Sequence, residues 1–169
     1  IDARDISGVT TYTSESSTAA VTINYAAAIS NLTINSSSGN AGATLHTFNM
    51  VDAATVGTAD AMTITLDNID SDTVVTLTDA GGTTNELETV TLNSIGLANT
   101  LATLTTSSVE TTILKVTGDQ SLTLTNAIDS KIATVDASAH TGTATSITGT
   151  DTATTYTGGS GADTFVAGT

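Results

Sequence analysis

Apolar residues alternate with threonine along most of the chain, and short polar turns separate the alternating segments. Successive side chains of a β-strand point to opposite faces, so this alternation predicts short strands with apolar residues inward and Thr outward. The clearest examples are residues 21–25, 32–34, 62–66, 75–78, 90–92, 122–125 and 132–135.

The predicted strands recur at a regular spacing. Their centres are about 12 to 14 residues apart in the middle of the chain and nine apart at its end. They fall near Ile64, Leu77, Val90, Leu104 and Val116, and then at Ile147, Tyr156 and Phe165. Short strands at regular spacing fit either a solenoid or a β-sandwich, and the nearly constant period favours the solenoid.

Composition supports the same fold. Threonine, a good strand former, contributes 40 of the 169 residues, while Pro and Trp are absent and five residues are aromatic. A thin aliphatic core suits stacked strands better than a wide sandwich, which usually buries Trp or several aromatic residues. We therefore expect an all-β parallel β-solenoid (β-helix or β-roll) over residues 1–169 as one segment, with a β-sandwich as the alternative.

The charge limits the class of partner. The formal net charge is −14, and Arg4, Lys115 and Lys131 are the positive side chains. Nucleic-acid binding depends on Lys and Arg, so neither nucleic acid nor an anionic membrane surface is an expected partner. No apolar run approaches membrane-spanning length, so membrane insertion is not expected. Bound multivalent cations would offset the self-repulsion of such an acidic chain.

A glycine-rich nonapeptide occupies residues 158–166, Gly-Gly-Ser-Gly-Ala-Asp-Thr-Phe-Val. It fits the repeat G-G-x-G-x-D-x-U-x of the calcium-binding parallel β-roll, in which U is a large apolar residue. Glycines allow a tight turn that aims carbonyl oxygens at a hard cation, and Asp adds a charged oxygen. We therefore predict Ca²⁺ ligation at Gly159, Gly161 and Asp163.

A degenerate unit precedes the nonapeptide, so we place the start of the β-roll at residues 149–169. This unit keeps an apolar residue, Tyr156, but has Thr154 at the position of the aspartate. Asp151 is a further candidate oxygen ligand for the neighbouring unit. In a β-roll the calcium lies between successive turns, so one complete unit supplies half of a pocket.

A second acidic cluster comprises Asp67, Asp70 and Asp72, at the end of a predicted strand. Three carboxylates within six residues repel one another unless they are solvated or bind a metal. Both interpretations stay open: an exposed acidic turn, in which Asp has its usual role, or a calcium site.

The T-x-T elements recur every 13 to 14 residues, centred on Ile64, Leu77, Val90 and Leu104. If they stack, their threonines form one outward ladder with a spacing of about 4.8 Å. The simpler interpretation is that Thr is a soluble outward residue wherever a strand occurs.

Catalytic motifs are not evident, and we expect no enzymatic activity. His46 and His140 stand apart from each other with no Cys in the chain, which argues against a zinc site. No G-x-S-x-G elbow gives any Ser a nucleophile context.

The segments 113–124, 132–138 and 147–149, followed by the nonapeptide, resemble the RTX-containing S-layer and surface-adhesion proteins of Gram-negative bacteria. The resemblance implies type I secretion, an extracellular location at the cell surface and calcium-dependent folding and assembly. It assigns the calcium role to Gly159, Gly161 and Asp163.

Two functions follow as expectations. The first is a structural S-layer segment that self-associates with identical subunits into a lattice or filament, with outer-surface polysaccharide as a further partner. The alternative is a stalk or binding segment of a secreted RTX adhesin that contacts sugar, another surface or ice.

Overall fold

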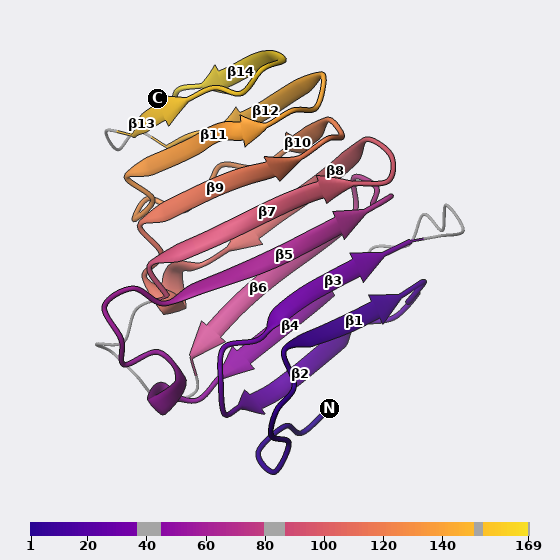
Figure 1. Cartoon of the computed structure of the whole chain (residues 1–169), viewed down its shortest axis with the longest axis vertical. Helices are drawn as coiled ribbons and strands as arrows, with labels where there is room; N and C mark the ends of the chain where they lie inside the picture. Colours follow the sequence, from indigo (N-terminus) through magenta and orange to yellow (C-terminus); the bar gives the residue numbers. More distant parts are fainter. Residues whose placement is uncertain (37–44, 80–86, 151–153, 169) are drawn as a thin grey trace.

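The computed structural model describes residues 1–36, 45–79, 87–150 and 154–168, which form two facing parallel sheets (Figure 1). We call them the odd sheet and the even sheet after their strand numbers. The odd sheet contains, in spatial order, β1 (Thr11–Glu15), β3 (Asn31–Asn35), β5 (Ala61–Asp67), β7 (Thr89–Ile95), β9 (Ile113–Gly118), β11 (Thr134–His140) and β13 (Thr155–Thr157). The even sheet contains β2 (Val21–Ala26), β4 (Leu45–Met50), β6 (Thr73–Asp79), β8 (Asn99–Thr105), β10 (Leu122–Leu124), β12 (Ala144–Thr148) and β14 (Ala162–Val166). Two 3-10 helices, η1 (Asp52–Ala54) and η2 (Ser107–Val109), lie in the connections after β4 and β8.

The chain alternates between the sheets, so each turn of the solenoid contains two strands. Each strand from β3 to β12 pairs with the strand two places before it and the strand two places after it, and every pairing between described strands is parallel. This arrangement confirms the predicted all-β parallel solenoid. A sandwich of antiparallel sheets, the alternative, does not describe it.

The turns of the solenoid become shorter toward the C-terminal end. Leu92 pairs with Ile64, a step of 28 residues from 64 to 92. Phe165 pairs with Ile147, a step of 18 residues from 147 to 165. Eighteen residues are two nine-residue units, so the nine-residue spacing in the sequence is the step from one sheet to the other.

The inward positions of both sheets form one aliphatic core. Leu66, Leu77, Leu92 and Leu114 are completely buried between the sheets, as the alternation predicts. Burial of a leucine side chain contributes roughly 1.5–3 kcal/mol. The side chains that make up the rest of this core are mainly Val, Ile, Leu and Ala.

Aromatic residues lie at the two ends of the stack. At the N-terminal end the ring of Tyr12 packs edge-on against Phe48, with centroids 5.7 Å apart. At the C-terminal end Tyr156 stacks on Phe165, with centroids 5.1 Å apart and an interplanar angle of 17°. These pairs cover the ends of a core that is otherwise aliphatic.

The T-x-T elements do not form a single ladder, because successive elements belong to different sheets. Thr63 pairs in register with Thr91 in the odd sheet. Thr76 pairs with Thr105 in the even sheet, on the opposite side of the solenoid. Outward threonines therefore cover both faces, which agrees with their being soluble strand residues.

Asn99 replaces an apolar residue at an inward position of β8 and is fully buried. Its side-chain oxygen accepts a hydrogen bond from the Ile69 N–H at 2.8 Å. Its amide nitrogen lies 2.8 Å from Ser94 Oγ, 2.9 Å from the Leu97 carbonyl and 3.1 Å from the Leu66 carbonyl. Asn99 therefore ties two successive turns of the solenoid together from the inside.

His140 has the same role two turns further along. Its Nε2 lies 2.8 Å from the Gln120 carbonyl oxygen, which only accepts, so Nε2 carries the proton. Nδ1 then accepts a hydrogen bond from the Thr145 hydroxyl at 2.9 Å. The buried imidazole is satisfied at both nitrogens and links the β9–β10 turn to the β11–β12 turn.

Candidate functional site

The glycine-rich turn between β13 and β14 stacks closely on the turn between β11 and β12. The Ser160 N–H donates to the His140 carbonyl at 3.1 Å. A Cβ atom at Gly159 would lie 2.5 Å from the same carbonyl, and one at Gly161 would overlap the carbonyl oxygen of Gly142. These two positions require glycine because a backbone passes where any side chain would begin.

Asp163 faces the inside of this last turn. It pairs in register with Thr145, which is a buried inward residue of β12. Its Oδ2 accepts a hydrogen bond from the Gly159 N–H at 2.7 Å. Its Oδ1 is buried and has no hydrogen-bond partner within the residues that the structure describes. The nonapeptide thus brings Gly159, Gly161 and Asp163 together in one turn.

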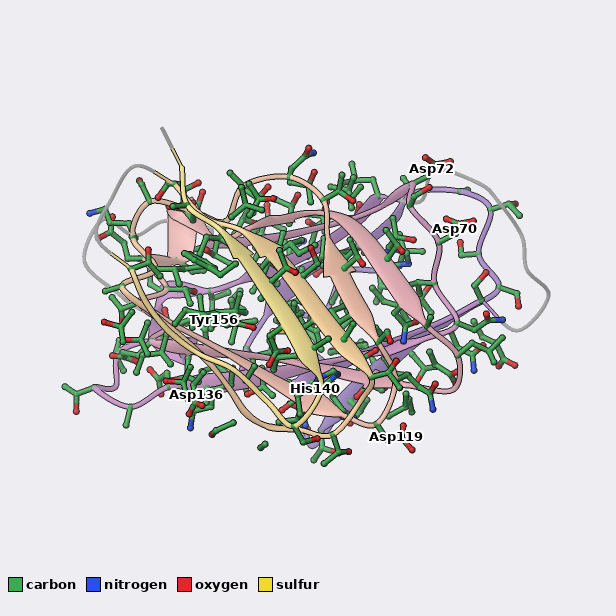
Figure 2. All side chains as sticks on the ribbon, turned by 90° about the horizontal axis from the view of Figure 1, so that it is seen from above. Asp70, Asp72, Asp119, Asp136, His140 and Tyr156 are labelled. Carbon is green, nitrogen blue, oxygen red and sulfur yellow. The ribbon has the colours of Figure 1, made fainter. Side chains whose placement is uncertain are left out.

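Tyr156 lies between the two sheets (Figure 2), where its ring stacks on Phe165. Burial of the phenol, with a smaller contribution from the negative charge of Asp163, raises the pKa of Tyr156 to about 12. Its hydroxyl is buried and, in the described part of the chain, has no hydrogen-bond partner. The end of the solenoid therefore holds a carboxylate oxygen and a phenol oxygen that the described protein groups leave unsatisfied.

These atoms fit the coordination chemistry of a hard cation. Calcium prefers carboxylate and carbonyl oxygens, and a buried carboxylate oxygen without a donor is costly unless a proton or cation compensates it. Asp163 would supply the charged oxygen, and the carbonyls of the turn at Gly159 and Gly161 would supply neutral ones. The bound ion would neutralise the carboxylate.

The second acidic cluster lies at another edge of the solenoid, where Figure 2 shows Asp70 and Asp72 at the periphery. Asp67 ends β5 and accepts a hydrogen bond from Asn35 Nδ2 at 2.9 Å. Asp70 Oδ1 accepts from the Asp72 N–H at 3.3 Å, as in an Asx turn. Each of these two carboxylates has its own local hydrogen bond, and Asp72 is exposed.

Across residues 1–36, 45–79, 87–150 and 154–168, no three His, Asp or Glu side chains gather into a group that would hold a metal ion. Asp151, the further candidate ligand, lies outside the described residues. The structure thus brings together the nonapeptide residues, and it leaves the calcium sites at both clusters as predictions.

One polar contact was not foreseen from the sequence. His46 Nε2 lies 2.9 Å from Ser14 Oγ, and both side chains are buried. They line a cavity of about 10 Å³ with Asp70, which is room for about one water molecule. Ser14 is 7% exposed, so this hydrogen bond lies inside the fold. His46 lies two residues before the inward Phe48 in an alternating strand, so it also faces inward. This spacing was the signal in the sequence that His46 is buried.

Comparison of this chain with protein-family models, with curated proteins and with solved structures found no match. Within the described segments, no helix is long and apolar enough to cross a membrane. The fold and the site geometry therefore carry the functional argument on their own.

Proposed function

We propose that this chain is a structural, calcium-responsive segment of an extracellular surface protein, of the RTX-containing S-layer type, that self-associates. One observation carries the proposal. The C-terminal turn of the solenoid combines a repeat-type glycine turn with an inward carboxylate, Asp163, one oxygen of which is buried without a partner among the described residues.

Calcium supplies the switch in this proposal. At low calcium the net charge of −14 opposes compaction, which suits an exported chain. At high calcium the ion is held by Asp163 and by the carbonyls of the Gly159 and Gly161 turn. Binding to the folded state alone stabilises the solenoid by mass action.

The terminal strands are the proposed contacts for self-association. In the described structure β13 and β14 stand at the outer edges of their sheets, and β1 stands at the opposite edge of the odd sheet. An edge strand that is left unpaired is a template for pairing with another chain. The half-buried pair Tyr156 and Phe165 adds apolar area beside these edges. Head-to-tail pairing of unlike ends gives open filaments.

The proposed location is outside the cell, at the bacterial surface, after type I secretion. The partners are identical subunits and outer-surface polysaccharide. A structural role is supported by the burial of both described histidines, which make hydrogen bonds inside the fold. An enzymatic role is not part of the proposal.

Sedimentation velocity with circular dichroism tests the proposal on the wild-type chain, Asp163→Asn and Asp136→Asn, in calcium and in chelator. Asp136 is the matched control because its carboxylate lies at an outward position and accepts a hydrogen bond from the Ser138 N–H at 3.0 Å. We expect calcium-dependent association for the wild type and for Asp136→Asn, and its loss in Asp163→Asn. A wild-type chain that stays monomeric in calcium contradicts self-association and favours a stalk or adhesin segment.

A further inference from the structure

The outward strand positions of the even sheet carry no charged side chain among the described residues. Most of them are occupied by hydroxyl, amide or small apolar side chains, and Tyr25 and Leu45 are larger exceptions. The two carboxylates in this sheet, Asp79 and Asp163, occupy inward positions of the alternation. The outward residues include Thr22, Asn24, Thr47, Asn49, Val74, Thr76, Thr78, Thr100, Thr103, Thr105, Thr123, Ser146, Thr148, Thr164 and Val166.

The odd sheet is different. Its outward positions include Glu15, Asp67, Lys115 and Asp136, spread from β1 to β11. The ion pair between Asp2 and Arg4 lies at the N-terminal corner of the even face, where Asp2 forms a parallel bridge with Asn24 and Arg4 lies over the Tyr25 ring. From β4 to β14 the described outward strand positions of the even sheet thus carry no charge, in a chain with a net charge of −14.

Hydroxyl groups form columns across this neutral face. One column runs through Thr22, Thr47, Thr76 and Thr105, in register from β2 to β8. Another runs through Thr100, Thr123, Ser146 and Thr164, from β8 to β14. Threonine columns present methyl groups and hydroxyls at the rung spacing of about 4.8 Å, a surface that interdigitates with a like surface.

The lack of charge at these outward positions indicates which partner would bind to this face. Two copies of an acidic chain repel each other, and the repulsion is least when they meet through surfaces without carboxylates. Sugar binding by ring stacking is less well supported, because among the described outward positions Tyr25, at the N-terminal corner, is the aromatic one. The first column crosses β8 at Thr105 and the second at Thr100, so the two columns do not form one continuous flat array, which disfavours binding to ice.

The size of the face sets the strength of the contact. Seven strands spaced about 4.8 Å apart and roughly five residues long cover about 500 Å². A stable interface buries about 800 Å² on each partner, so this contact is weak for one pair of copies. Many such contacts along two filaments act together, and their combined affinity is far higher.

We infer that the neutral outer face of the even sheet is a lateral contact between two copies of this chain, packed sheet against sheet. This inference deepens the proposed function, since it gives the self-assembling chain a side-to-side contact distinct from its ends. The contact requires neither calcium nor the C-terminal turn, and raised ionic strength strengthens it by screening the surrounding carboxylates.

Two triple variants with equal added charge test this inference. Thr47→Glu with Thr76→Glu and Thr123→Glu adds three charges to the even face. The control, Thr33→Glu with Thr65→Glu and Thr91→Glu, adds three to the odd face. All six positions face outward in strands. Sedimentation equilibrium in chelator measures the lateral contact without calcium, at an ionic strength that screens the carboxylates and at which circular dichroism shows each variant to be folded.

We expect the wild-type chain and the odd-face control to dimerise, and the even-face variant to lose at least tenfold in association constant. Equal association of the two variants, or a monomeric wild type, overturns the inference. Calcium-dependent filament formation is measured in a separate experiment, on the wild type and Asp163→Asn. The proposed function and the lateral contact can therefore be contradicted independently of each other.

Single cysteines give a second readout if a triple variant does not fold. The chain has no cysteine, so Thr76→Cys and Thr91→Cys each introduce one thiol, on the even and odd faces respectively. A short bifunctional thiol cross-linker should yield several times more dimer with Thr76→Cys. Equal yields from the two variants contradict the inference.

Discussion

The carboxylate of Asp163 accepts a hydrogen bond from the backbone N–H of Gly159, at 2.7 Å, across the turn that joins β13 to β14. The turn conformation and the state of this carboxylate are therefore coupled. Its second oxygen is buried and has no partner among the described residues, and its negative charge contributes to the raised pKa of Tyr156. The last described turn of the solenoid thus holds the carboxylate to which the proposed calcium response is assigned.

Replacement of Gly159 by Ala should destabilise this turn. The added Cβ would lie 2.5 Å from the His140 carbonyl oxygen and 2.8 Å from that of Ala137, and both are backbone atoms that cannot move independently. We expect a loss of roughly 1–3 kcal/mol, measured by chemical denaturation. Ser160→Ala is the control, because Ser160 is exposed, and it should change stability by about 0.5 kcal/mol or less. Equal unfolding midpoints would contradict the close stacking.

Titration of Tyr156 should report the charge of Asp163. The pKa of the phenol is raised from 10.0 to about 12, first by burial and then by the Asp163 carboxylate. The folded state holds the phenol proton more tightly than the unfolded state does. Tyr156 therefore contributes to the stability of the fold below pH 10, and this contribution is lost as the pH rises from 10 to about 12. Ultraviolet absorbance should show a tyrosine that ionises at unusually high pH, and this transition should be absent in Tyr156→Phe.

Asp163→Asn should lower the pKa of Tyr156 part of the way toward its ordinary value, because burial persists while the negative charge is removed. Asp136→Asn removes an outward carboxylate and should leave this titration unchanged. An unchanged Tyr156 titration in Asp163→Asn would show that the carboxylate does not act on the phenol.

Removal of the buried amide of Asn99 should be costly. Asn99→Leu leaves the Ile69 N–H and the Leu66 carbonyl without the partner that the side chain supplies. Each unsatisfied buried group costs about 1–3 kcal/mol. The matched change Asn126→Leu removes an exposed hydrogen bond to Thr103 and should cost much less. Equal denaturation midpoints for the two variants would contradict the internal role of Asn99.

Truncation of leucine side chains should show which of them the two sheets enclose. Leu92 is completely buried in β7, so Leu92→Ala should cost about 2–5 kcal/mol. Leu45 is 44% exposed on the even face, and Leu45→Ala should cost far less. Denaturant midpoints check both variants, and similar losses would mean that the sheets do not enclose the core as described.

The alternation of apolar residues and Thr was sufficient to predict the strands, because a β-strand has a strict period of two. The nearly constant spacing of the strands then predicted the parallel solenoid. Neither pattern was sufficient to predict the number of strands per turn. The spacing from Ile64 to Leu77 is a step between strands, and whether two or three such steps close a turn depends on loop geometry. The pairing of Ile64 with Leu92 shows that two do.

Buried polar residues were the least predictable part. The sequence did not single out Asn99, because Asn is usually found in turns. The separation of His46 and His140, in a chain without Cys, argued only against a zinc site. The hydrogen-bond partners of Asn99 and His140, which are Ile69 and Gln120, belong to the preceding turn of the solenoid, so the register had to be known first. Asp163 was identified from the nonapeptide, and its inward orientation follows from the strand parity of Phe165.

Circular dichroism during a calcium titration, with sedimentation of the same samples, is the most direct test of the proposed calcium-dependent assembly. We expect a gain in β-structure at millimolar calcium, together with larger species, and the loss of both in chelator and in Asp163→Asn. A β-spectrum and a monomeric sedimentation coefficient that are the same in calcium and in chelator would contradict it.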